Sequence, residues 1–80
     1  MRTKMLSQLQ TGEQGKVLRI TAQGPVRRRI MQMGVTPGTE ICVKGVAPLG
    51  DPIEILVKGY RLSLRKDEAA DVLIEVMDGE

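Results

Sequence analysis

The chain has 80 residues, of which 41% are hydrophobic and 28% charged, and this predicts one small globular domain over residues 1–80 rather than a disordered segment. It contains no histidine and a single cysteine, Cys42, so an internal disulfide is excluded and the usual ligands of a zinc site are missing. The net charge of +2 is unevenly distributed, because residues 67–80 hold six acidic residues and none of the twelve Lys and Arg.

The N-terminal segment shows no targeting signal. Residues 1–15, MRTKMLSQLQTGEQG, carry early positive charge but lack the apolar stretch of a signal peptide. No run of about eighteen apolar residues, the minimum for a spanning helix, occurs anywhere in the sequence. We therefore expect a cytoplasmic protein that does not insert into the membrane directly.

Short segments with alternating apolar residues predict five β-strands, at 16–22, 39–47, 53–58, 60–65 and 71–76. Their buried faces are expected to hold Leu18, Ile20, Ala22, Ile41, Val43, Ile53, Ile55, Val57, Tyr60, Leu62 and Leu64. Gly59 predicts a tight hairpin between the third and fourth strands, and 66–70 is long enough for only one helical turn. Because closure removes exposed edges, five short strands favour a small, mostly β barrel over an open sheet.

One segment departs from the strand period. Val26, Ile30 and Met33 recur at helical spacing, Pro25 is suited to a first helical turn, and Gly34 is suited to a C-terminal cap. The sequence therefore predicts a short helix, inserted between the first and second of the predicted strands, that buries these three apolar residues.

Three consecutive arginines lie on this helix. Arg27, Arg28 and Arg29 diverge by about 100° each, so they cannot line one strip against a phosphate backbone. In one interpretation, the stems of Arg27 and Arg29 cover apolar surface while Glu13 or the acidic C-terminal segment pairs with their heads. In the other, the arginines and the outward-facing Met31 contact a partner protein, because Arg and Met are enriched at such interfaces.

Catalytic and nucleic-acid-binding constellations are missing from the sequence. No base accompanies Cys42 or Ser63, and Asp51 with Glu54 offers too few oxygens for a calcium site. We expect no enzymatic activity, no metal and no cofactor. A small barrel that binds nucleic acid usually presents aromatic stacking platforms, whereas Tyr60 is the only aromatic residue here. Leu49, between two prolines of a loop, is instead a candidate anchor for a protein partner.

Three segments in this order, RRRIMQMGVTPGT, APLGDPIE and GYRLSLRKDEA, resemble the FeoA family, small cytoplasmic companions of the bacterial ferrous-iron transporter FeoB. The resemblance covers nearly the whole chain. It implies a Src-homology-3-like β-barrel with an inserted helix. It also implies a non-enzymatic role in ferrous iron uptake, through contact with the GTPase-like cytoplasmic part of FeoB, which would recruit the chain to the inner membrane.

The candidate contact residues lie on the helix, the proline-bounded loop and the outward side of 60–65: Arg27, Arg28, Met31, Leu49, Asp51, Arg61 and Arg65. Two alternatives stay open at this point. One is a small basic barrel that binds RNA or the ribosome, and the other is a stand-alone relative of the C-terminal module of metal-dependent repressors. The sequence also leaves self-association open.

Overall fold

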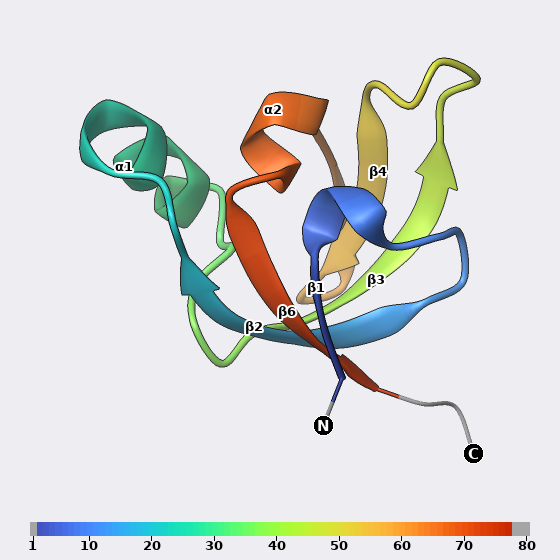
Figure 1. Ribbon diagram of the computed structural model, residues 1–80, viewed down its shortest axis with the longest axis horizontal. Helices are drawn as coiled ribbons and strands as arrows, with labels where there is room; N and C mark the ends of the chain where they lie inside the picture. The colour runs from blue at the N-terminus through green and yellow to red at the C-terminus, as the bar shows by residue number, and fades with distance from the viewer. Residues whose placement is uncertain (1, 78–80) are drawn as a thin grey trace.

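Six antiparallel strands form the body of the protein in the computed structural model, which describes residues 2–77 (Figure 1). In spatial order the strands are β1, β6, β2, β3, β4 and β5. The elements in chain order are β1 (Arg2–Met5), the 3-10 helix η1 (Leu6–Gln8), β2 (Gln14–Ile20), α1 (Gly24–Gln32), β3 (Glu40–Val46), β4 (Ile53–Val57), β5 (Tyr60–Leu64), α2 (Lys66–Ala69) and β6 (Val72–Met77). The prediction of a mostly β domain with one short inserted helix is confirmed.

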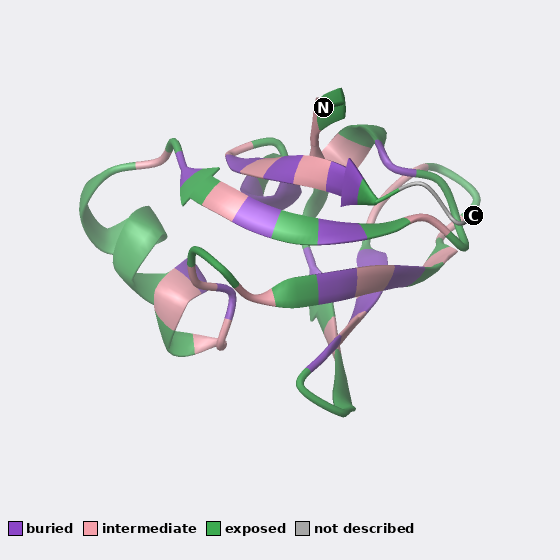
Figure 2. Ribbon diagram, turned by 90° about the horizontal axis from the view of Figure 1, so that it is seen from below, coloured by how far each residue is buried: buried purple, intermediate pink, exposed green. Residues whose placement is uncertain are grey.

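The sheet curls around one aliphatic core. In β3 and β4 the expected alternation is confirmed, because Ile41, Val43, Ile53, Ile55 and Val57 are all buried (Figure 2). The core also contains Leu6, Leu9, Val17, Ile20, Ile30, Val35, Leu64, Ala69, Val72, Ile74 and Val76. With no Phe or Trp available, β-branched side chains supply most of this packing, as suits a pleated surface.

Two differences from the predicted strands have local causes. The strand β1 was not predicted, because its sequence RTKM lacks apolar alternation, and it forms only by pairing with β6 at the edge of the sheet. In β2 the buried apolar side chains are those of Val17 and Ile20, while the predicted Leu18 is half-buried. The pairing of β2 with β6 shifts register between Val17 and Arg19, and this irregularity breaks the simple alternation.

The predicted hairpin between β4 and β5 is confirmed. Lys58 and Gly59 both have positive φ, 51° and 85°, as a two-residue turn between antiparallel strands requires. At the end of this hairpin Tyr60 was expected to be buried, but its side chain is 46% exposed. Its hydroxyl donates a hydrogen bond of 2.6 Å to the carbonyl oxygen of Met33, so the ring lies across the end of α1 instead of in the core.

The helix α1 packs against the core with its C-terminal turn only. Ile30 is fully buried, and Met31 and Met33 pack against the core from partly buried positions. The expected burial of Val26 is wrong, since 45% of its surface is exposed, and the expected outward position of Met31 is also wrong. The first turn extends beyond the sheet, as Figure 2 shows by the exposed residues of that turn, so helical periodicity there does not produce burial.

Candidate functional site

The three arginines of α1 have three different environments. Arg29 pairs with Glu68 of α2 at an Nε–Oε2 distance of 3.2 Å. Arg27 donates a hydrogen bond of 3.0 Å from its Nη1 to the carbonyl oxygen of Ile20, at the end of β2. Arg28 is exposed and has no hydrogen-bond or ion-pair partner within residues 2–77. Two arginines therefore hold α1 in place, and Arg28 remains available for another molecule.

Glu68 joins the two helices. Only 8% of its surface is exposed, and both carboxylate oxygens are used. Oε1 accepts the backbone N–H of Arg65 at 3.0 Å, at the start of α2, and Oε2 accepts the guanidinium of Arg29. A buried carboxylate is stable only when it is paired in this way. The interpretation that the acidic C-terminal segment pairs with the arginines is thus confirmed for Arg29, whereas Arg27 uses a carbonyl oxygen.

Asp51 joins the loop between β3 and β4 to α2. Its Oδ1 accepts the backbone N–H of Lys66 at 3.0 Å, and its Oδ2 pairs with Nη2 of Arg65 at 3.1 Å. The first turn of a helix has unpaired N–H groups, so this carboxylate stabilises the start of α2. We call Arg29, Glu68, Arg65 and Asp51 the polar chain. It connects α1, α2 and the β3–β4 loop, which lie along the upper side of the molecule in Figure 1.

A hollow of about 330 Å³ lies between α1 and α2. It is lined by Val26, Arg29, Arg65, Asp67, Glu68 and Asp71. The exposed Val26 is thus part of a surface depression made mainly of charged side chains. Basic side chains of α1 and of the residue before α2 therefore meet acidic side chains of α2 and of Asp71, around one apolar side chain.

The structure brings some predicted contact residues together and separates others. Asp51 and Arg65 form an ion pair, and Leu49, 92% exposed, lies two residues before Asp51 at the tip of the same loop. Arg61, in contrast, pairs with Glu54 on the neighbouring strand at 3.5 Å. The candidate residues therefore belong to two areas, one along the polar chain and one on the β4–β5 hairpin.

Sequence reasoning missed two residues that organise this surface, Glu68 and Tyr60. A signal existed for Glu68, because an acidic residue three positions after Arg65 is typical of the first turn of a helix. No local signal marks the bond from Tyr60 to Met33, because the two residues are 27 positions apart in sequence.

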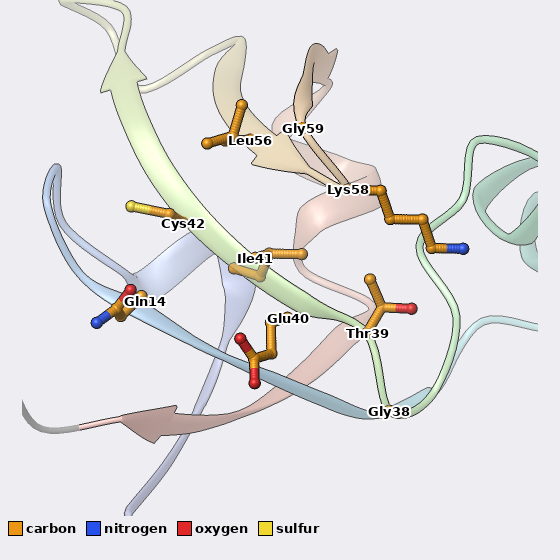
Figure 3. A pocket seen from close by; sticks show the side chains of 9 residues that line it. All are labelled: Gln14, Gly38, Thr39, Glu40, Ile41, Cys42, Leu56, Lys58 and Gly59. Atoms are coloured by element: carbon orange, nitrogen blue, oxygen red, sulfur yellow. The ribbon is translucent and has the colours of Figure 1, made fainter.

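A larger hollow, of about 490 Å³, lies on the outer face of β2, β3 and β4 (Figure 3). Its lining includes Cys42, Glu40 and Lys58. Figure 3 shows the thiol of Cys42 on the opposite side of the hollow from the amine of Lys58, so no base is aimed at the sulfur. Within residues 2–77 no three side chains of His, Cys, Asp or Glu converge as metal ligands would. The same part of the chain has no helix with the length and apolar character needed to span a membrane.

The comparisons with a protein family and with an individual relative agree with each other. The FeoA domain family matches residues 4–76. A fusion protein of Porphyromonas gingivalis, described as Fe(2+) transport protein A/Fe(2+) transporter FeoB, is 39% identical over 72 residues. These residues make up 90% of this chain but only 8% of the fusion protein, so the chain spans a small part of that relative.

Solved structures of other proteins have the same fold as this chain. The FeoA-like protein of Clostridium acetobutylicum is 44% identical with a TM-score of 0.90, covering 100% of this chain and 93% of its own. FeoA of Stenotrophomonas maltophilia, described as an SH3 domain protein complexed with zinc, is 26% identical with a TM-score of 0.76, covering 94% and 91%. A manganese-dependent transcriptional repressor, 18% identical with a TM-score of 0.87 over 96% of this chain and 38% of its own, shares the fold alone.

Proposed function

The chain belongs to the FeoA family, and on that basis we propose that it is a non-enzymatic accessory protein of ferrous iron uptake. It acts by binding the cytoplasmic GTPase part of a FeoB-type membrane transporter. Its place is the cytoplasm, and its partner recruits it to the inner membrane. The cargo iron does not need a site on this chain, because the proposed role is contact with the transporter.

One observation carries the proposal. In the Porphyromonas gingivalis relative, the counterpart of this chain and a FeoB transporter are described as one fusion protein. Joining two proteins in one chain gives each a high effective concentration near the other, which favours even a weak contact. Two separate chains with the same function would need a docking surface that provides the corresponding affinity.

We assign the contact to the candidate residues Arg27, Arg28, Met31, Leu49, Asp51, Arg61 and Arg65, with Arg28 and Leu49 as its direct anchors. Arg28 has no partner within residues 2–77, and Leu49 exposes nearly all of its apolar surface on a loop held by Asp51. The other five residues are tied to the barrel by hydrogen bonds, ion pairs or packing, so they present and orient the surface.

The chemistry of the surface supports a protein partner over a nucleic acid. Tyr60 is the only aromatic residue, whereas nucleic-acid-binding barrels stack successive bases on several aromatic rings, and its hydroxyl is already bonded to Met33. Arg29, Arg61 and Arg65 each pair with an acidic side chain, which reduces the positive field available to phosphates. A surface that makes few phosphate contacts binds a generic oligonucleotide weakly, and its affinity changes little with salt concentration.

The test is a titration of this chain with the cytoplasmic domain of its FeoB-type transporter, followed by calorimetry. We expect Arg28→Glu and Leu49→Ser each to weaken binding about tenfold, a change typical of an interface anchor. Neither substitution removes an intramolecular partner within residues 2–77, so both variants should keep the melting temperature of the parent chain.

Lys44→Glu is the matched control, because it makes the same charge change at an exposed residue of β3, outside the candidate contact residues. It should bind like the parent chain. Absence of any binding by the parent chain contradicts the proposed function. Normal binding by both Arg28→Glu and Leu49→Ser contradicts only the assigned surface, whereas tight, steeply salt-dependent binding to an oligonucleotide supports the nucleic-acid alternative.

A further inference from the structure

The strand β5 forms one edge of the six-stranded sheet. It pairs with β4 on one side, from Tyr60 opposite Val57 to Leu64 opposite Ile53. On its other side no backbone hydrogen bond reaches Arg61 or Ser63 from any residue of 2–77. An unpaired edge of this kind is a template for another extended chain.

The turn geometry determines which backbone groups of β5 face outward. In a two-residue hairpin the flanking residues, Val57 and Tyr60, exchange hydrogen bonds across the strands. Hydrogen-bonded pairs alternate with non-bonded pairs along an antiparallel ladder, so Leu62 and Leu64 also bond toward β4. The N–H and C=O groups of Arg61 and Ser63 therefore point away from the sheet.

An independent contact supports this orientation. Arg65 continues the outward series, two residues beyond Ser63, and its backbone N–H donates to Oε1 of Glu68 instead of to β4. The start of α2 thus covers the C-terminal end of the edge, and the turn at Lys58 limits the other end. The open part is short and has defined limits, and it offers two donors and two acceptors, from Arg61 and Ser63.

The charge around the open part is positive. Beside the open part, Lys58 and Arg61 are positive and Glu54, which pairs with Arg61, is negative, so one positive charge is in excess. Beyond its C-terminal end, the basic Arg65 and Lys66 lie next to acidic side chains: Asp51, Asp67 and Glu68. Lys58 has no partner within residues 2–77. A chain that adds to this edge therefore finds backbone groups to bond and a positive flank that favours acidic side chains.

We propose that the outward edge of β5, at Arg61 and Ser63, binds an extended acidic segment of a partner protein by β-strand addition. The strand edge of a second copy is a poorer occupant, because it brings the same excess of basic side chains, and like charges on adjacent strands are destabilising. This inference rests on the proposed function only in taking the occupant to be a protein, and it adds the conformation and charge of the bound segment.

The experiment uses a capped, fluorescent peptide of alternating Glu and Val as the probe. Anisotropy gives its dissociation constant for the full chain, and amide exchange of Arg61 and Ser63 reports where it binds. We expect saturable binding with slowed exchange at both amides. Ser63→Pro removes one outward N–H while leaving the bonds to β4 in place, since proline is tolerated at such edge positions, and should weaken binding about tenfold.

Ser63→Thr is the matched control, because it keeps the N–H and a strand-forming side chain, and it should bind the peptide as the parent chain does. If Ser63→Pro fails to fold, the parent chain is titrated with a peptide N-methylated at alternate residues, which cannot bond through one edge. We expect that peptide to bind about tenfold more weakly.

Several outcomes would overturn the inference: no binding of the Glu and Val peptide, equal binding by the Ser63→Pro variant or the N-methylated peptide, or equal binding of a Lys and Val peptide. A dimer of the parent chain that Ser63→Pro dissociates would assign the edge to a second copy instead. The probe is not the transporter, so failure of the peptide to bind leaves the proposed function standing. Conversely, absence of binding to the transporter does not contradict the edge site, which the peptide experiment tests by itself.

Discussion

At the scale of single residues, Glu13 has the most clearly perturbed environment. The backbone N–H of Gln10 donates to its carboxylate at 2.8 Å, and this bond is the largest cause that lowers the pKa of Glu13 from its ordinary value of 4.5. The Lys4 amine, 3.3 Å away, adds a hydrogen bond and an attraction in the same direction, partly opposed by desolvation. The folded state therefore favours the ionised carboxylate.

We predict that Glu13→Gln makes folding stability less dependent on pH in acid. A lowered folded pKa means that the stabilisation by Glu13 is fully present above the unfolded value, near 4.5, and is lost as pH falls through the folded value. The parent chain should therefore be more stable at neutral pH, and the difference from Glu13→Gln should shrink below about pH 4.5. Urea unfolding at a series of pH values measures this.

Glu40→Gln is the matched control for that comparison, because it removes an exposed carboxylate that has no hydrogen-bond or ion-pair partner within residues 2–77. Stability curves of the parent chain and Glu13→Gln that stay parallel from neutral pH into acid would contradict the assigned role of Glu13.

At the scale of elements, the end of α1 depends on one glycine. Gly34 has a φ of 94°, and the backbone closes the helix with bonds from Gly34 to Met31 and from Val35 to Ile30. This is the pattern in which a left-handed residue follows the last helical turn. A Cβ on Gly34 would lie 2.5 Å from the hydroxyl of Tyr60, so the hairpin tip packs directly on the helix terminus.

We predict that Gly34→Ala lowers the free energy of unfolding by about 2–3 kcal/mol. Two costs add up here, because the alanine must adopt a left-handed backbone conformation and its Cβ collides with the Tyr60 hydroxyl. Gly38→Ala is the matched control, since Gly38 has a φ of 92° but no atom within 4 Å of the added Cβ, and it should cost about 1 kcal/mol. In a Tyr60→Phe background the cost of Gly34→Ala should fall toward that of the control.

Thermal unfolding of the parent chain, the three single variants and the double variant checks the prediction, because about 1 kcal/mol shifts the melting temperature of a domain of this size by roughly 4–8 °C. An unchanged cost of Gly34→Ala in the Tyr60→Phe background would show that the hydroxyl does not restrict this position.

At the scale of the whole molecule, β2 and β6 pack closely as neighbouring strands within the six-stranded sheet. Gly15 is buried in β2 opposite Val76, and a Cβ there would collide with the backbone oxygen of Glu75 and with the side chain of Ile74. The backbone oxygen cannot move without disturbing the ladder. Gly15 is therefore required by close packing and not by a turn.

We predict that Gly15→Ala destabilises the fold by about 3 kcal/mol, the upper range for overpacking a well-packed position. The matched control is Gly45→Ala, a second strand glycine whose added Cβ would meet only the flexible carboxylate of Glu54 at 3.7 Å. It should change stability by less than about 0.5 kcal/mol. Denaturant unfolding measures both, and equal effects would contradict the role assigned to Gly15.

The sequence by itself determined the strands from β2 to β6, but not β1. Alternation of Ile53, Ile55 and Val57 predicted the buried face of β4, and Gly59 predicted the turn that follows, because both depend on interactions between residues close in the chain. The same reason explains the end of α1 at Gly34. The sequence also supplied the candidate contact residues, but it did not show which of them lie close together.

Only the tertiary structure decided which side chains are free to bind. Periodicity assigned Val26 to the core, but the core ends before the first turn of α1. The pairs Arg29 with Glu68 and Arg65 with Asp51 join residues that are distant in sequence and adjacent only in the folded chain, and they leave Arg28 unpaired within residues 2–77. Local patterns specify elements, whereas the availability of a charge depends on neighbours that distant parts of the chain provide.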